Sequence, residues 1–199
     1  MVALRTVLPR GKTGILDKAV ARTTPPLAGA NAVVAAWLSS TVGRRKTNVA
    51  RASFQILVLP YRRTGDKFEV ALFKRADDGN WQGIAGAGED RETPLQAAIR
   101  ETQEESGIPP VATFVRLDTV SSVPVTCFRD SHLWGEEVYV IPEHAFGVLA
   151  DRQEIRLSPE HSTFAWFSIE EANQKLKYDS NRTALWELNQ RLLGLGPRG

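Results

Sequence analysis

The chain lacks the features that stabilise small secreted proteins or place a protein in a membrane. It has a single cysteine, Cys127, so no disulfide can form within it, and a disulfide-bonded framework is excluded. Residues 27–42 are uncharged, but these 16 residues are diluted by small and polar side chains, and a membrane-spanning helix needs about 20. We therefore expect no membrane partner and a reducing, cytoplasmic location.

Histidine is scarce as well. His132, His144 and His161 are the only three, and their spacing matches no zinc site, so we expect each to be hydrogen-bonded or exposed. A phosphate-binding loop is also absent: Gly11-Lys12-Thr13 has Thr6 where such a loop requires glycine.

Acidic residues are nearly missing from residues 1–51, which hold nine Lys and Arg against one Asp, a net charge of +8. Residues 52–199 hold 16 basic and 22 acidic residues, a net charge of −6. The basic isoelectric point thus belongs to the N-terminal part and makes a nucleic-acid partner unlikely for the folded part. We predict a basic, disordered or loosely packed extension over residues 1–51, with organelle targeting as the alternative, and one folded domain over residues 52–199.

The strongest helix signal lies in the middle of the chain. Thr93 is a good N-cap, Pro94 suits the first helical position, and Gln96 completes a capping box. Gly107 stands where a left-handed C-cap residue belongs. These signals predict a helix over residues 94–106. Its apolar face consists of Leu95, Ala98, Ile99 and Thr102.

Three carboxylates share a flank of this helix, because Glu101, Glu104 and Glu105 are spaced three and four residues apart. Glu92 precedes the cap and adds a fourth. Such crowding is repulsive unless a cation is present, and hard oxygen ligands suit Mg²⁺ or Mn²⁺. A solvated acidic face is the alternative.

Spacing favours the metal site. The stretch follows the pattern Gly-x5-Glu-x7-Arg-Glu-U-x-Glu-Glu-x-Gly-U, in which U is a bulky apolar residue. At a usage of about 7% per residue type, seven fixed positions match by chance about once in 10⁸ starting points. The pattern resembles the Nudix box, from which Thr102 departs at the first U. The fixed positions are Gly86, Glu92, Arg100, Glu101, Glu104, Glu105 and Gly107.

The remaining elements fit a mixed β-sheet between helices. Strands are predicted over residues 53–59 (ended by Pro60), 68–74, 81–86, 114–125, 136–141 (ended by Pro142) and 163–167. The first two strands form a hairpin. Short and long helices begin at Ile169 and Asn181, the latter with a packing stripe of Leu185, Leu188, Leu192 and Trp186.

The resemblance covers about residues 52–193 and implies an α/β fold, the Nudix α/β/α sandwich. It also implies a Mg²⁺-dependent hydrolase, with Mn²⁺ possible, acting on a phosphoanhydride of a small molecule. The metal ligands would be the carbonyl of Gly86 and the carboxylates of Glu101, Glu104, Glu105 and Glu160. Either Glu101 or Glu160 would activate the attacking water. We expect Arg100, counted with the catalytic residues, to orient Glu92 by a charge-assisted pair.

Within this family the chain is most similar to bacterial dihydroneopterin triphosphate and dATP pyrophosphatases. The residues that carry this likeness are Lys74-Arg75, Trp81-Gln82, Glu160-His161 and Ser180-Asn181-Arg182. It implies substrate contacts by Lys74, Arg75, Trp81 and Tyr178, a nucleotide or pterin triphosphate as substrate, and the monophosphate and pyrophosphate as products. The alternatives are a hydrolase of dinucleoside polyphosphates or nucleotide sugars, or a nucleotide-sensing module without catalysis. A homodimer is possible.

Overall fold

The computed structural model describes residues 51–128, 131–151 and 154–195. The extension, with disorder or organelle targeting, was predicted over residues 1–51 and lies outside this part except for Arg51, which begins the first strand. No helix in the described part is long and apolar enough to cross a bilayer. In chain order the elements are β1 (Arg51–Thr64), β2 (Lys67–Arg75), β3 (Trp81–Gln82), β4 (Ile84–Glu89), α2 (Pro94–Ser106), β5 (Phe114–Pro124), η1 (Val125–Cys127), η2 (Ser131–Trp134), β6 (Val140–Leu149), β7 (His161–Ser168), α3 (Ile169–Lys175) and α4 (Asp179–Leu192).

Strand β1 is the centre of a mixed sheet. It pairs antiparallel with β4 through its first half, antiparallel with β2 through its last four residues, and parallel with β6. β3 and β7 both pair with β2, and β5 pairs with β6. The predicted hairpin of the first two strands is confirmed.

The first strand passes through Pro60, so the predicted end of that strand was wrong. Pro60 lies between Val58, which pairs with β4, and Tyr61, which pairs with β2. Proline has no N–H to give to a ladder. At this change of partner from β4 to β2, one edge of β1 needs no N–H donor from Pro60. The strand therefore continues through the proline.

Strand β6 likewise contains Pro142, which was predicted to end a strand over residues 136–141. Pairing of β6 with β1 begins only at Glu143, so Pro142 has a partner on one side alone, Ser122 of β5. The missing N–H can face the open side. The strand therefore starts later and runs further than its apolar pattern indicated.

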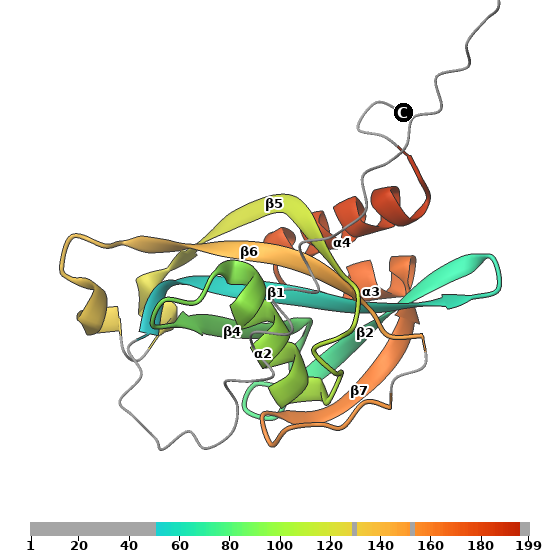
Figure 1. Ribbon diagram of the computed structural model, residues 1–199, viewed down its shortest axis with the longest axis horizontal. Coiled ribbons are helices and arrows are strands. Elements are labelled where there is room, and N and C mark those ends of the chain that lie inside the picture. Colours follow the sequence, from blue (N-terminus) through green and yellow to red (C-terminus); the bar gives the residue numbers. More distant parts are fainter. Residues whose placement is uncertain (1–50, 129–130, 152–153, 196–199) are drawn as a thin grey trace, which may run out of the picture.

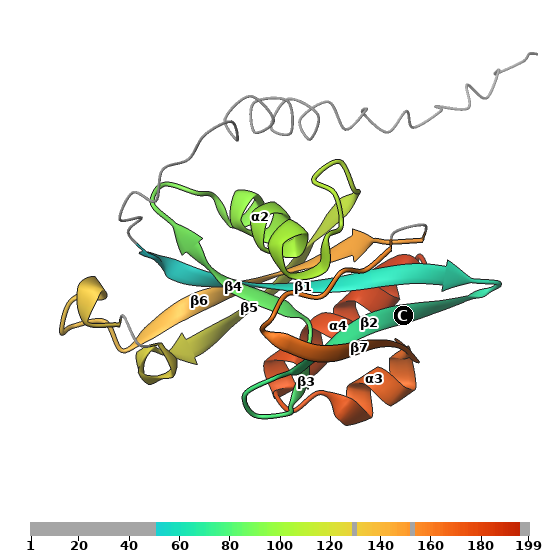
Figure 2. The ribbon, with the colours of Figure 1, turned by 90° about the horizontal axis from the view of Figure 1, so that it is seen from below.

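The sheet separates two helical layers (Figures 1 and 2): α2 covers one face, and α3 with α4 covers the other. Each layer has its own core cluster. In β1, Leu57 and Leu59 point toward α3 and α4, whereas Ile56 and Val58 point toward α2, as the alternation of a strand requires. The predicted α/β/α sandwich is confirmed.

The last helix, α4, begins at Asp179, two residues before the predicted start. Leu185 and Leu188 are buried against the sheet, and Leu192 packs beside them. Trp186 is 61% exposed, so its place in the packing stripe was predicted wrongly. Neighbouring helical residues point about 100° apart, and burial of Leu185 turns Trp186 outward.

Thr102 occupies the apolar face of α2 and is fully buried. Its Oγ1 has no hydrogen-bond partner among the described residues, and a buried hydroxyl without a partner costs about 1–3 kcal/mol. We expect Thr102→Val, which keeps the shape, to raise the free energy of unfolding by about 1 kcal/mol in urea denaturation. Thr102→Ser, which keeps the hydroxyl and loses the methyl, should be less stable than wild type. A Thr102→Val chain no more stable than Thr102→Ser would contradict this account.

Candidate active site

Helix α2 carries most of the predicted site and is fixed at both ends. Thr93 Oγ1 accepts a hydrogen bond from the N–H of Gln96, and the Gln96 side chain accepts one from the N–H of Thr93 at 2.8 Å. Gly107 caps the other end with a φ of 71°, and its N–H donates to the carbonyl of Gln103. The prediction of a helix over residues 94–106, with both caps, is confirmed.

Arg100 is a buried cation among four carboxylates. Its Nε and Nη2 donate to the two oxygens of Glu92 at 2.9 and 3.0 Å. Its Nη1 donates to Glu101 at 2.9 Å and to Glu104 at 3.3 Å, and Glu89 lies 3.9 Å from Nε. Burial lowers the pKa of Arg100, but the bond to Glu92 and the charge of Glu101 outweigh it and hold the pKa above its ordinary value. The expected pairing of Arg100 with Glu92 is confirmed, and the same guanidinium partly neutralises the acidic flank of α2.

The carboxylate of Glu101 lies against the backbone of Gly86 in β4. A β-carbon on Gly86 would come within 2.1 Å of the carboxylate carbon, so the close approach requires glycine. The Glu101 side chain is 15% exposed. Burial raises its pKa to about 7, although the charge of Arg100 opposes the shift. Glu101 is therefore a carboxyl group that can take up and release a proton near neutral pH.

Glu105 and His161 form a buried pair between α2 and β7. Glu105 Oε2 and His161 Nε2 are hydrogen-bonded at 2.7 Å, and the two side chains are 5% and 0% exposed. Burial raises the pKa of the Glu105 carboxyl, and the hydrogen bond with His161 opposes this. The sequence predicted only that His161 would be hydrogen-bonded or exposed. Its partner, 56 residues away, was missed.

Two backbone hydrogen bonds attach the segment before β7 to the C-terminal end of α2. The N–H of Arg156 donates to the carbonyl of Ser106 at 2.8 Å, and that of Ser158 donates to the carbonyl of Glu105 at 3.2 Å. They satisfy carbonyls that a helix end leaves unpaired. Glu160 follows at once, 61% exposed. Burial and the histidine have the larger effects on the pKa of Glu105, and the charge of Glu160 also raises it. Glu160 therefore belongs to the same acidic region.

Arg75, at the end of β2, lies beside this region. Its Nε donates to Asp77 Oδ1 at 2.8 Å, and its Nη1 is 3.7 Å from Glu160 Oε2. It is a predicted substrate-binding residue that lies within ion-pair distance of a predicted metal ligand.

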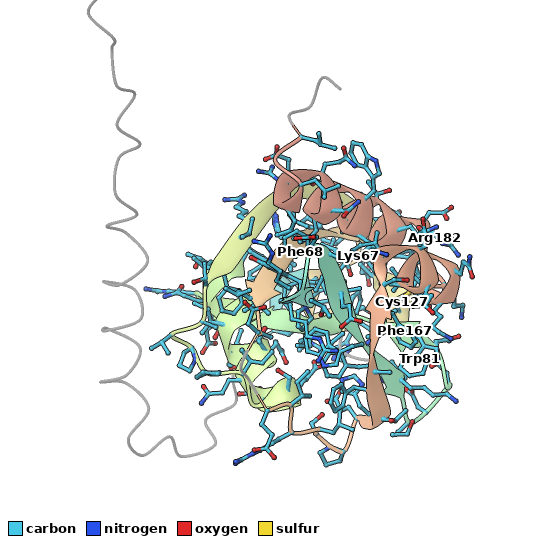
Figure 3. The ribbon with its side chains drawn as sticks, turned by 90° about the vertical axis from the view of Figure 1, so that its right-hand side faces the viewer. Lys67, Phe68, Trp81, Cys127, Phe167 and Arg182 are labelled. Atoms are coloured by element: carbon cyan, nitrogen blue, oxygen red, sulfur yellow. The ribbon has the colours of Figure 1, made fainter. Side chains whose placement is uncertain are left out.

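The other predicted substrate-binding residues lie elsewhere. Lys74 and Trp81 face each other across β2 and β3, so both side chains share the face covered by α3 and α4. Figure 3 shows Trp81 next to Phe167, whose ring it meets edge-on at 5.2 Å between centroids. Lys175 Nζ lies 4.9 Å from the Phe167 ring centre. Tyr178, 50% exposed, precedes α4.

No three acidic or histidine side chains in the described part of the chain already converge on one point as a metal site. Arg100 binds Glu101 and Glu104 instead, and His161 binds Glu105. The donors themselves fit a hard divalent cation, because carboxylate oxygens are the ligands that Mg²⁺ and Mn²⁺ prefer. Such a cation would compete with the Nη1 of Arg100 for two of the three carboxylates.

Comparison with known proteins supports a family assignment. The family model described as NUDIX domain matches residues 54–187. The dihydroneopterin triphosphate diphosphatase of Escherichia coli K12 is 31% identical over 143 residues, which cover 70% of this chain and 94% of that protein. The asymmetrical bis(5'-nucleosyl)-tetraphosphatase of Sus scrofa is 31% identical over 133 residues, 62% of this chain and 81% of that protein. An octanoyltransferase of Myxococcus xanthus is 30% identical over 123 residues, 59% of this chain, but the chain spans only 31% of its length.

The fold agrees with these matches. A crystal structure from Listeria monocytogenes, assigned as a NUDIX hydrolase, superposes with a TM-score of 0.66 at 36% identity, covering 72% of this chain and 96% of that one. Nudix hydrolases generally use a divalent metal ion. Since the family model covers most of the described residues and relatives of nearly full length are diphosphatases and tetraphosphatases, the chain belongs to the Nudix family and is a Nudix pyrophosphohydrolase.

Proposed function

We propose that this chain is a Mg²⁺-dependent pyrophosphohydrolase, with Mn²⁺ as a substitute, that acts on a nucleoside triphosphate or on dihydroneopterin triphosphate. Its products are the monophosphate and pyrophosphate. The observation that carries the proposal is the acidic flank of α2, in which Glu101 abuts Gly86 and Glu105 is held by a buried histidine. The 31% identity with the E. coli dihydroneopterin triphosphate diphosphatase supports the substrate class.

In this proposal the carbonyl of Gly86 and the carboxylates of Glu101, Glu104, Glu105 and Glu160 would hold the metal ion. A bound divalent ion neutralises charge on the phosphate oxygens. The three carboxylates of α2 lie on adjacent turns of one helix, and the closure of the Glu160 segment onto the end of that helix supports the inclusion of Glu160.

Glu101 is the residue that we assign to take the proton of the attacking water. Burial raises the pKa of Glu101 to about 7 in the metal-free chain, and a bound cation would lower it and keep the carboxylate ionised, the form in which it can accept a proton. Glu160, the alternative base, is largely exposed. Arg100 acts through the carboxylates that it binds, because it is 7% exposed and its donors are occupied by protein oxygens.

Substrate phosphates are assigned to Arg75, since its guanidinium lies beside Glu160 and can bind phosphate oxygens by charge-assisted hydrogen bonds. Lys74, Trp81 and Tyr178 stay predictions of the sequence. Lys74 and Trp81 share the side of the sheet covered by α3 and α4, and Tyr178 precedes α4.

A dinucleoside polyphosphate is the second candidate substrate. It is favoured by the 31% identity with the asymmetrical bis(5'-nucleosyl)-tetraphosphatase of Sus scrofa, of which the chain covers 81%. The same carboxylates would serve this reaction, since the bond broken is again a phosphoanhydride.

The test is a substrate panel with mass identification of both products. The full chain is incubated with Mg²⁺ and, separately, dihydroneopterin triphosphate, dATP, the other nucleoside triphosphates and diadenosine tetraphosphate. Pyrophosphate and a monophosphate from a triphosphate support the first proposal. An unsymmetrical split of the tetraphosphate as the fastest reaction supports the second. No turnover of any substrate, with Mg²⁺ or Mn²⁺, overturns both.

Gly86→Ala is expected to lower kcat/KM by about 100-fold. The new β-carbon would meet the Glu101 carboxylate at 2.1 Å, so the carboxylate must move by about 1 Å or more to reach an ordinary contact distance, and a misplacement of that size costs about this factor. Gly65→Ala is the matched control. Its β-carbon would meet nothing within 4 Å, and its φ of +63° makes the backbone of this variant strained too, so it tests strain without a clash at Glu101. Equal activity of the two variants would contradict the role of Gly86.

A further inference from the structure

We propose that His161 is a positioning residue for Glu105: it holds one oxygen of that carboxylate so that the other is presented to the metal. This inference rests on the proposed function, because it assumes that Glu105 is a metal ligand. Its observations are separate, however. They are the 2.7 Å bond between His161 Nε2 and Glu105 Oε2 and the nearly complete burial of both side chains.

The hydrogen bonds of the histidine assign its tautomer. His161 Nδ1 is buried and has no hydrogen-bond partner among the described residues. A proton on Nδ1 would leave a buried donor unsatisfied, which is costly. The neutral ring therefore carries its proton on Nε2, and this N–H donates to Glu105 Oε2.

The ring is held firmly enough to act as a fixed donor. It packs on the buried ring of Phe73 with 5.2 Å between centroids. The backbone of His161 pairs with that of Arg75 across β7 and β2. The backbone N–H of His161 donates to the carbonyl of Ser158 at 3.2 Å. Ser158 is itself bonded to the backbone of Glu105, so donor and acceptor are fastened to the same short segment.

The bond leaves the carboxylate of Glu105 with one free oxygen. Oε2 is taken by His161, whereas Oε1 accepts no hydrogen bond from the described residues. A carboxylate fixed in this way offers a single, oriented oxygen to a cation. Partners that orient metal ligands typically contribute about 10- to 100-fold to metal affinity.

Metal binding without substrate tests the inference directly. Free and bound Mn²⁺ are measured by electron paramagnetic resonance on the full chain and on His161→Leu, His161→Gln and Glu105→Gln. We expect His161→Leu to weaken Mn²⁺ binding by about 10- to 100-fold. His161→Gln, whose amide can donate from a similar position, should recover most of the loss. His161→Leu added to Glu105→Gln should weaken binding no further, because both changes remove one interaction.

The outcomes separate the two proposals. Unchanged Mn²⁺ affinity in a folded His161→Leu chain, or equal losses in His161→Leu and His161→Gln, overturns the role of His161 and leaves the proposed function standing. A wild-type chain that binds no Mn²⁺ overturns both. His132→Leu, at an exposed histidine in η2, is the matched control and should bind as wild type does.

A measurement on the wild-type chain covers the case in which His161→Leu does not fold. The chain is labelled with ¹⁵N-histidine, and the ring of His161 is identified among three histidines by nuclear Overhauser effects to Phe73. An Nε2–H tautomer whose shift changes when Mg²⁺ is added supports the inference. An Nδ1–H tautomer overturns it.

Discussion

Glu101→Gln should lower kcat by about 10³-fold, the range for loss of a general base, and at the same time make the metal-free chain more stable above neutral pH. In the proposed mechanism the activity loss follows from the removal of a proton acceptor and metal ligand, a carboxylate that the structure places against the backbone of Gly86. A purely structural role for Glu101 would leave kcat within a few fold of wild type. The assay uses the best substrate of the panel at saturating Mg²⁺.

The stability gain follows from the pKa of Glu101. Burial raises it from 4.5 to about 7. Between these two values the folded chain keeps a proton that the unfolded chain has lost, so the free energy of unfolding falls as pH rises. The whole loss of unfolding free energy due to Glu101 is present above pH 7 and is about 3 kcal/mol at most. Because glutamine does not titrate, the stability of the variant should lack this dependence on pH.

Urea denaturation in EDTA at pH 5 and pH 8 measures the effect. Glu101→Gln should exceed wild type in stability at pH 8 by more than it does at pH 5. A difference between the two chains that does not change with pH would show that Glu101 is not the carboxyl with the raised pKa.

Arg100→Met should lower the free energy of unfolding by about 3–5 kcal/mol, the usual cost of removing one partner from a buried ion pair. Glu92 and Glu101, whose side chains are 16% and 15% exposed, would lose the cation between them. Arg100→Lys should restore only part of the loss, since an ammonium cannot bind both oxygens of Glu92 as the guanidinium fork does.

Arg156→Met is the matched control. The ion pair of Arg156 with Glu154 spans 3.6 Å between side chains that are 79% and 83% exposed, and exposed pairs contribute about 0–1 kcal/mol. Equal losses in Arg100→Met and Arg156→Met, measured by urea denaturation, would mean that the acidic flank of α2 does not depend on Arg100.

The parts of the molecule that could be predicted carry their own local signals. Thr93, Gln96 and Gly107 define the ends of α2 through contacts within a few residues, and the carboxylates of that helix share a flank by helical geometry alone. The pairing of Arg100 with Glu92 spans eight residues and was also predicted from the sequence. Helix caps and helix faces need no knowledge of the sheet.

What could not be predicted depends on which strands lie side by side. Pro60 and Pro142 continue their strands because each lies where one edge has no partner. The side of the sheet reached by Lys74 depends on the pairing of β2 with β3. The contact of His161 with Glu105 appears only when β7 is placed against the end of α2, and nothing near either residue signals it.

The position of β1 has a consequence for how helix α2 can move. β1 pairs with three strands, and its Ile56 and Val58 pack in the same cluster as Ala97 and Ala98 of α2. Detaching α2 would expose that cluster and weaken the strand on which the whole sheet is assembled. Local opening of the helix is therefore coupled to global unfolding, and its slowest amide hydrogens should exchange no faster than those of β1.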